Sequence, residues 1–262
     1  MQTQWNDMPS QIKNIIDGSE FSEIHQGYSS SQVFKVVSRE KGYFYLKINR
    51  VSQHFSFLHE IQILQWLHGK ISVPEVVEYV RDDRFEYVVL TEIPGINCVE
   101  AMTTLDYTQI VKLLAEGLLA IHQLEISQCP FDESIDTKLK HAQIRLDHGL
   151  VDESDFDAER QGMTAQEIKE SLEKSRPHEE DSVFTHGDYC LPNIILRNHR
   201  VSGYIDLGRA GISDRYNDLA IASRSICENL GLEYEEYFFK QYGIETIDIE
   251  KIAYYRMMDE LF

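Results

Sequence analysis

The spacing of apolar residues changes near Pro94–Gly95, and this change constrains the fold more than any other feature of the chain. Before it, residues 20–48 are rich in aromatic and β-branched residues, as is typical of strands, whereas residues 57–67 are spaced as a helix. After it the spacing is mainly helical, in residues 106–125, 134–149 and 164–176. We therefore predict an α+β chain with a β-rich N-lobe containing one helix, over residues 1–93, and a mainly α C-lobe, over residues 94–262.

Shorter signals refine this division. Residues 10–17 have the spacing of a short amphipathic helix ahead of the predicted strands. Gly42 and Asp82–Asp83 mark the turns of two β-hairpins. Within the C-lobe, three short segments predict a small embedded sheet: SVFTH, NIILR and RVSGYIDL. The chain beyond Asp214 is expected to be mainly helical.

The composition limits the partners of this protein. Asp and Glu number 44 against 25 Lys and Arg, which gives a net charge of −19. A surface of this sign repels nucleic acid and anionic membranes and attracts a cationic ligand, although solubility alone also accounts for it. The four cysteines form no C-x-x-C pair, so we expect reduced thiols rather than a zinc site. No membrane span or signal peptide is evident, and a cytoplasmic protein is expected.

Two motifs carry the chemistry: HGDYCLPN at residues 186–193 and IDLGR at residues 205–209. Phosphoryl transfer needs a carboxylate beside the attacking hydroxyl and oxygen ligands that hold magnesium across the phosphates. Asp188 would orient the hydroxyl and accept its proton. Asn193 and Asp206 would give Mg²⁺ the hard oxygen donors that it prefers. The sequence therefore predicts a magnesium-dependent kinase.

The two motifs resemble the catalytic loop and the metal-binding segment of protein kinases. In this form they are similar to the aminoglycoside 3′-phosphotransferases, together with four further segments: residues 214–220 (DRYNDLA), Val73-Pro74, Cys129-Pro130 and residues 254–262 (YYRMMDELF). The resemblance covers nearly the whole chain. It implies a protein-kinase-like two-lobe fold, and transfer of a phosphoryl group from ATP or GTP to the 3′-hydroxyl of an aminoglycoside, which would confer antibiotic resistance.

In the N-lobe, the kinase scheme requires a lysine on a strand and a glutamate on the following helix. Lys47 has the strand context, and Glu60 follows thirteen residues later within the predicted helix, although Glu40 and Glu75 are also available. An ion pair between them would hold the lysine ammonium against the nucleotide phosphates.

The resemblance also implies further nucleotide contacts. A serine-containing loop, GYSSS at residues 27–31, stands where kinases have a glycine-rich loop, so Ser29 and Ser30 would contact the β-phosphate. Tyr45 would stack on adenine, or else simply pack in the sheet. Residues Thr91 to Ile93 would form the hinge that contacts the adenine edge.

On the acceptor side, the ammonium groups of an aminoglycoside require an acidic site. Matching the family motif position by position implies the following contacts: Asp157, Glu159, Asp188, Arg209, Glu228, Asn229, Glu260 and Phe262, the last through its terminal carboxylate. For each acid, a solvated surface charge is the alternative interpretation. His186 and Asp218 are expected to brace the catalytic loop rather than to take part in the reaction.

Other functions remain open at this point. A kinase-like chain could phosphorylate a different small hydroxylated substrate, such as choline, homoserine or a macrolide. An inactive kinase-like binding module is disfavoured, because Lys47, Asp188, Asn193 and Asp206 are all present. The residues do not distinguish ATP from GTP, nor 3′ from 5″ phosphorylation.

Overall fold

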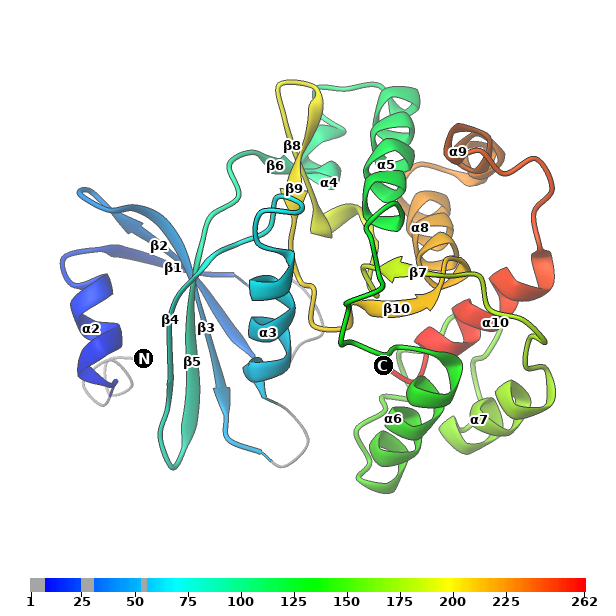
Figure 1. Cartoon of the computed structure of the whole chain (residues 1–262), viewed down its shortest axis with the longest axis horizontal. Helices are drawn as coiled ribbons and strands as arrows, with labels where there is room; N and C mark the ends of the chain where they lie inside the picture. The colour runs from blue at the N-terminus through cyan, green and yellow to red at the C-terminus, as the bar shows by residue number, and fades with distance from the viewer. Residues whose placement is uncertain (1–7, 25–30, 53–55) are drawn as a thin grey trace. The chain divides into compact units, whose positions relative to one another are not determined.

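The computed structural model describes residues 8–24, 31–52 and 56–262. The chain divides into two compact units, residues 1–94 and 95–262, each described by itself below (Figure 1). The first unit is built mainly from strands and the second mainly from helices, which confirms the α+β class. The functions that the sequence analysis assigns to the two lobes stay predictions.

The first unit contains one antiparallel sheet in the order β1-β2-β3-β5-β4. Its elements are α2 (Ser10–Ile16), β1 (Glu20–Ile24), β2 (Gln32–Ser38), β3 (Gly42–Arg50), α3 (Phe57–Leu67), β4 (Val76–Arg81) and β5 (Phe85–Thr91). The predicted helices and hairpins of this unit are therefore present. The Ser56 side chain accepts a hydrogen bond from the N–H of Leu58 and caps α3, which explains why the helix begins at Phe57.

Alternation along β3 separates the two faces of this sheet. Phe44, Leu46 and Ile48 are buried in a cluster that includes residues of α2. Because successive side chains of a strand point to opposite faces, Tyr45 and Lys47 lie on the other face. Figure 1 shows α2 and α3 on opposite sides of the sheet, so Lys47 faces α3. The period-2 pattern of β3 thus places a lysine opposite a helix.

The second unit contains seven helices among the described residues: α4 (Cys98–Ala101), α5 (Tyr107–His122), α6 (Ile135–Asp147), α7 (Ala165–Lys174), α8 (Tyr216–Asn229), α9 (Glu235–Tyr242) and α10 (Ile249–Asp259). Its strands are β6 (Ile96–Asn97), β7 (Ser182–Thr185), β8 (Ile194–Arg197), β9 (Arg200–Tyr204) and β10 (Gly211–Asp214), with 3₁₀ turns at Leu191–Asn193 and Leu232–Tyr234.

The small sheet predicted for this unit is two separate sheets. β7 pairs with β10, whereas β8 pairs with β6 and β9. The sequence analysis missed β10, because Gly211-Ile212-Ser213-Asp214 has a single large apolar residue and no alternation. Tertiary packing nevertheless buries this strand, with Asp214 fully covered. Pairing with β7 satisfies its backbone groups where water cannot reach them.

Helix α5 buries its apolar face within the second unit and supports the catalytic motif. Its Leu114 and Leu118 are fully buried, and Leu114 O accepts a hydrogen bond of 2.8 Å from the hydroxyl of Tyr189. A Cβ at Gly117 would lie 2.7 Å from the same hydroxyl, so only glycine lets the helix approach this closely. Residues 186–193 are therefore held against the buried face of α5.

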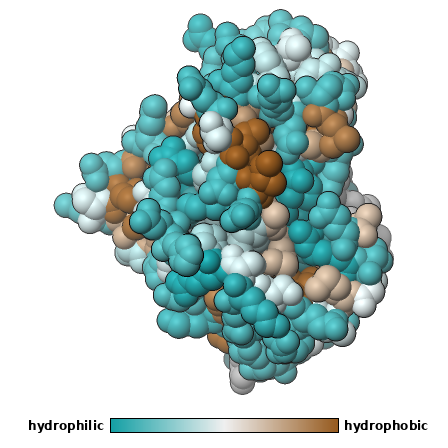
Figure 2. Space-filling model, turned by 90° about the vertical axis from the view of Figure 1, so that its right-hand side faces the viewer, coloured by the Kyte–Doolittle hydropathy of each residue, from teal (hydrophilic) through white to brown (hydrophobic). Residues whose placement is uncertain are grey.

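The face of the molecule in Figure 2 is mainly hydrophilic, with hydrophobic residues in small separate groups. This surface agrees with the net charge of −19. Within the part of the chain that the structure describes, no helix combines the length and the apolar character that a membrane crossing requires.

Candidate active site

Asp218 holds the backbone at the start of the catalytic motif. It lies in the first turn of α8 and is fully buried. One carboxylate oxygen accepts the N–H of His186 at 2.6 Å, and the other accepts the N–H of Gly187 at 2.9 Å. His122 on α5 adds a contact of 3.1 Å between Nε2 and Oδ2. Asp218 therefore braces the loop from a helix N-terminus, as expected.

His186 is a structural residue of this loop. Burial lowers its pKa, and this effect outweighs the nearby charges of Asp218, Asp188 and Asp206, which act to raise it. The imidazole is therefore neutral at pH 7, and its Nδ1 accepts the N–H of Asp188 at 3.3 Å. A neutral, fully buried ring fixes the position of Asp188 without contacting solvent.

Gly187 brings the two motifs together. Its φ is +85°, in the left-handed region that favours glycine. A Cβ at this position would lie 2.0 Å from the carbonyl oxygen of Arg209. The HGD segment can therefore pass directly against the end of the IDLGR segment, and this approach places the Arg209 side chain beside Asp188.

The Asp188 carboxylate is oriented by two neighbours and remains accessible to solvent. Asn193 Nδ2 donates to one carboxylate oxygen at 2.9 Å and to the Asp188 carbonyl oxygen at 3.0 Å. Arg209 Nη2 lies 3.3 Å from the other carboxylate oxygen, and the Asp188 side chain is 32% exposed. The arrangement holds the carboxylate in one place while leaving it reachable by a hydroxyl.

Asp206 follows β9 and has a left-handed backbone, with φ of +58°. A non-glycine residue in this region is uncommon, although aspartate tolerates it better than most. The N–H of Ile205 donates to the Asn193 carbonyl oxygen at 3.0 Å, which joins the two loops at this point. Asp206 is exposed, and its charge acts on His186 together with that of Asp188.

The donor set of this site suits Mg²⁺. Asn193 uses its amide nitrogen for Asp188, so its oxygen Oδ1 is left for another partner. An amide oxygen and the carboxylates of Asp188 and Asp206 are hard donors, and Mg²⁺ commonly completes its shell with water and substrate phosphates. No cluster of three or more His, Cys, Asp or Glu side chains suited to a metal ion occurs among the described residues. A shell shared with phosphates does not require one.

Asp259 is a site residue that the sequence analysis missed. Its carboxylate pairs with Arg209 Nη1 at 2.8 Å and also with Arg224. Burial acts to lower the pKa of Arg209, but the charges of Asp259 and Asp188 outweigh it and raise that pKa. The guanidinium that contacts Asp188 is therefore fixed by an aspartate at the end of α10. Its position in the MMDELF segment, next to the predicted Glu260, is the only signal that the sequence offers.

Two predicted acceptor residues, Asp157 and Glu260, lie together. The N–H of Asp157 is 3.3 Å from each oxygen of the Glu260 carboxylate, and Arg160 contacts both side chains. Burial, together with the hydrogen bond and charge of Asp157, raises the pKa of Glu260 to about 7. Burial acts to raise the pKa of Asp157, but its contacts with Glu260 and Arg160 outweigh burial and lower that pKa. The pair is held in place by the arginine.

The other predicted acceptor residues are less closely grouped. Glu159 is 82% exposed and lies 3.8 Å from Arg160. Glu228 and Asn229 are exposed at the end of α8, where Asn229 donates to the Ser225 carbonyl oxygen at 2.8 Å. The Phe262 carbonyl oxygen accepts a bond of 2.9 Å from Arg145. The structure thus brings Asp157 and Glu260 together, and leaves Glu159 on the surface.

Glu260 gives a pH prediction with a defined sign. The pKa of Glu260 rises from 4.5 to about 7 on folding. At pH values between these two, the folded state therefore binds more protons than the unfolded state. The free energy of unfolding should therefore contain a component that falls as pH rises from about 5 to 7. In Glu260→Gln, the free energy of unfolding should fall less between pH 5 and pH 8 than it does in the wild type. Urea unfolding at the two pH values measures this difference. The exposed neighbour Glu159→Gln is the control, and an unchanged profile in Glu260→Gln would contradict the assignment.

In the first unit, the predicted ion pair between Lys47 and Glu60 is present. Lys47 Nζ lies 2.9 Å from Glu60 Oε1, and the two side chains are 14% and 12% exposed. The alternative Glu75 is 64% exposed and lies 3.8 Å from His68. Lys47 and Glu60 come from β3 and α3, so the strand-then-helix context identified the pair correctly. Its role in nucleotide binding stays a prediction.

The remaining nucleotide residues are placed only in part. Ser29 and Ser30 lie outside the described residues. Tyr45 is half-buried on the same face of β3 as Lys47, with the Lys35 ammonium 5.9 Å from its ring centroid. The N–H of Thr91 donates to the Glu75 carbonyl oxygen at 2.9 Å, so any adenine contact by Thr91 would need another of its groups. Ile93 lies two residues beyond β5.

Comparison with known proteins identifies the family of this chain. Residues 20–258 match the model of the phosphotransferase enzyme family, and the chain belongs to this family. Within it, the chain is 34% identical over 255 residues to an aminoglycoside 3′-phosphotransferase of Niallia circulans, covering 97% of both. It is 37% identical to the aminoglycoside 3′-phosphotransferase of Streptomyces fradiae, over 79% of this chain and 80% of that one.

Solved structures of aminoglycoside phosphotransferases have a similar fold. The crystal structure of an aminoglycoside 3′-phosphotransferase of type VIII matches with a TM-score of 0.85 and 29% identity, over 98% of this chain and 99% of that one. A Streptomyces rimosus aminoglycoside phosphotransferase in complex with ADP and streptomycin matches with a TM-score of 0.80 over 95% of each chain. Its identity is 23%, so it supports the fold alone. The predicted resemblance to the aminoglycoside 3′-phosphotransferases is confirmed.

Proposed function

We propose that this chain transfers the terminal phosphoryl group of ATP or GTP to the 3′-hydroxyl of an aminoglycoside, and so confers resistance to the antibiotic. The observation that carries the proposal is the carboxylate of Asp188, fixed by Asn193 and Arg209 yet 32% exposed. The names of the relatives support the acceptor class and the position of the hydroxyl. A cytoplasmic location stays a prediction.

The proposed reaction needs one proton transfer and one displacement. Asp188 orients the acceptor hydroxyl and takes its proton as the hydroxyl oxygen bonds to the γ-phosphorus. The bond from that phosphorus to the bridging oxygen breaks, and the nucleoside diphosphate leaves. Asn193 and Asp206 would hold Mg²⁺, which supplies positive charge to the phosphates. Lys47, held by Glu60, would add its charge at the α- and β-phosphates.

The acceptor would bind through the acidic residues of the second unit. Ammonium groups of an aminoglycoside form ion pairs with carboxylates, and complementary charge both steers and selects such a ligand. We assign these ion pairs to Asp157, Glu159, Glu228, Glu260 and the terminal carboxylate of Phe262. Asn229 would contribute a hydrogen bond, and Arg209 would contact the hydroxyl side. A net charge of −19 favours capture of a polycation over any anionic partner.

A coupled phosphotransfer screen tests the proposed function. ATP and GTP are each offered with kanamycin, neomycin, a macrolide and choline, and nucleoside diphosphate release is followed. Turnover with the aminoglycosides supports the proposal, and ³¹P–¹H correlation of the product identifies the 3′ or 5″ position. Turnover only with the macrolide or choline would overturn the acceptor assignment. No turnover with any of these acceptors would contradict the proposed activity.

Glu60→Gln tests the nucleotide role of the first unit. Loss of the Glu60 charge removes the carboxylate that lies 2.9 Å from Lys47 Nζ, which weakens the positioning of the lysine. We expect the KM for ATP to rise about tenfold, on the scale of one partly buried charge pair. Glu75→Gln removes a glutamate that is 64% exposed and serves as the matched control. Equal KM values for the two variants would exclude the proposed role of the pair.

A further inference from the structure

Arg160 comes directly after the segment Asp157–Glu159, whose two acidic residues are assigned to the acceptor. Its Nη1 contacts the Asp157 carboxylate and lies 3.4 Å from Glu260 Oε1. Its Nη2 lies 3.8 Å from Glu159 Oε2. The Arg160 side chain is only 9% exposed and Glu260 only 4%, so the contact between these two is largely shielded from water. A guanidinium therefore stands among the carboxylates that are expected to bind acceptor ammonium groups.

The contacts of Arg160 limit how far an acceptor can reach the carboxylates of Asp157 and Glu260. Glu260 is 4% exposed and Asp157 is 25% exposed, although both are assigned to the acceptor. The positive charge of Arg160 takes the place that a ligand ammonium would take beside these two carboxylates. Two cations cannot both pair closely with the same small acidic cluster without repelling each other. An acceptor ammonium must therefore compete with Arg160.

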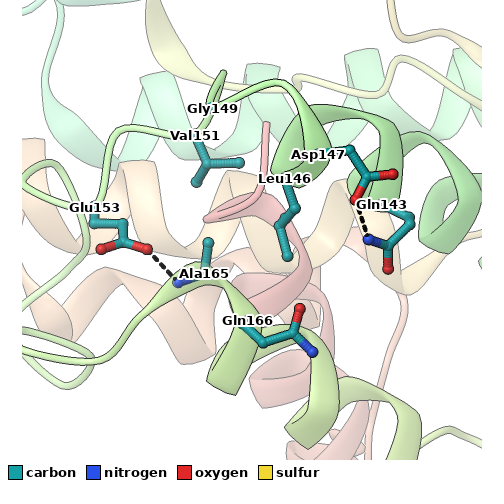
Figure 3. A pocket seen from close by; sticks show the side chains of 8 residues that line it. All are labelled: Gln143, Leu146, Asp147, Gly149, Val151, Glu153, Ala165 and Gln166. Carbon is teal, nitrogen blue, oxygen red and sulfur yellow. Dashed lines mark hydrogen bonds between the residues drawn. The ribbon is translucent and has the colours of Figure 1, made fainter.

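The segment that carries Arg160 is anchored by contacts that do not involve the Arg160 side chain. The connection between α6 and α7 is anchored by Glu153, which accepts the N–H of Ala165 at 2.8 Å beside the pocket shown in Figure 3. It is anchored again by Phe156, whose side chain is buried. Glu159, at 82% exposure, already lies 3.8 Å from Arg160 Nη2, so the guanidinium has one carboxylate partner at the surface besides Asp157 and Glu260. If Arg160 gave up its contacts with Asp157 and Glu260 and kept Glu159 as its partner, the first two carboxylates would be uncovered.

We propose that Arg160 is a specificity-determining residue, an internal cation that pairs with Asp157 and Glu260 and that an acceptor ammonium displaces. This inference rests on the proposed function and deepens it. Because the ligand must replace an existing ion pair, only an acceptor with an ammonium group at this point recovers the lost interaction. The cluster thus selects polycationic acceptors over hydroxylated compounds with a single charge.

The first test compares Arg160→Gln with Arg176→Gln, which removes an arginine that is 41% exposed and pairs with Asp136. At pH 8 and low salt, Arg160→Gln should lower the KM for kanamycin about fivefold, the scale of one weak ion pair. The KM for ATP should not follow this change. The KM for kanamycin should also rise more steeply with added salt, because one more ligand charge is paired. Arg176→Gln should match the wild type in each measurement.

The outcomes of this test are distinct. If the wild type turns over no aminoglycoside, the proposed function fails and the inference fails with it. If the wild type is active but Arg160→Gln raises the KM for kanamycin or leaves it unchanged, Arg160 positions the carboxylates rather than competing for them, and only the inference is overturned.

A second measurement uses the wild-type protein and does not depend on how the variant folds. Phenylglyoxal modifies accessible guanidinium groups, and peptide mass spectrometry locates the modified arginines. Since Arg160 is 9% exposed in its pair with Glu260, it should react slowly alone. Kanamycin at saturation should increase its modification severalfold if the guanidinium is displaced. Unchanged or lower modification of Arg160 with kanamycin bound would overturn the inference.

Discussion

Asp188→Ala is expected to lower kcat by at least about a hundredfold, the usual scale for a lost positioned base. The variant lacks the carboxylate that Asn193 and Arg209 hold in place with part of its surface open to solvent. Its fold should persist, because Arg209 keeps its pair with Asp259 at 2.8 Å. Steady-state turnover with kanamycin and ATP measures kcat, and a thermal melt of the same variant checks that it is folded.

Asp188→Asn separates proton transfer from positioning. The amide can still accept a hydrogen bond from Arg209 but cannot take a proton at neutral pH. We expect a loss in kcat similar to that of the alanine variant. Asp147→Ala, at an exposed position on α6 in the same unit, is the control and should retain wild-type turnover. A catalytically competent Asp188→Ala enzyme would remove this residue from the proposed reaction.

Asp218→Ala should give the largest loss of stability. Its carboxylate accepts the backbone N–H groups of His186 and Gly187 and contacts His122, all in a fully buried position. Removing one partner of a buried charged network costs about 3–5 kcal/mol, because the other groups are left unpaired. Urea unfolding measures this loss, and Asp147→Ala, an exposed aspartate on α6, is the control.

The same residue predicts a pH dependence with the opposite sign to that of Glu260. Burial acts to raise the pKa of Asp218, but its hydrogen bond with His122 and the neighbouring contacts outweigh it and lower that pKa. Its contribution to stability is thus present above the unfolded pKa of 3.8 and is lost as pH falls through the lower folded pKa. Asp218→Ala should lack this acid-side loss. A loss of stability below pH 4 as steep as that of the wild type would contradict the assignment.

Turnover of Asp218→Ala should also fall, because the HGD segment is no longer fixed against α8. Asp218→Asn keeps one acceptor oxygen and should be intermediate in both stability and kcat. If Asp218→Ala were stable and fully active, the bracing role drawn from the two hydrogen bonds would be wrong.

Local patterns predicted much of this structure because they act over a few residues. The alternation of β3 places Lys47 opposite the following helix, and the serine cap before Phe57 sets where that helix begins. The HGD and IDLGR motifs each lie at the end of a short strand, which is visible in the chain itself. Periodicity did not predict β10, because that strand is buried by packing with β7 rather than by its own apolar residues.

The sequence did not reveal the ion-pair partners of the charged residues near the proposed acceptor site. Asp259 and Glu260 are neighbours at the end of α10, and consecutive residues of a helix point about 100° apart. Either could have faced Arg209, and the choice depends on how α10 packs against the rest of the unit. The sequence also offered no reason to expect Arg160 to be buried, since a basic residue in an acidic loop normally lies in solvent. Its burial between Asp157 and Glu260 follows from the approach of two segments a hundred residues apart.

By itself, the amino-acid sequence determined the α+β class and much of the order of the elements, and it predicted which side chains would carry phosphoryl transfer. Periodicity and short motifs report on near neighbours, where the backbone geometry leaves few choices. Only the tertiary structure decided which charge pairs with which: Arg209 with Asp188 and Asp259, and Arg160 with Asp157 and Glu260. Ion pairs between distant segments depend on distances of a few ångströms, and only packing of the whole unit sets these distances.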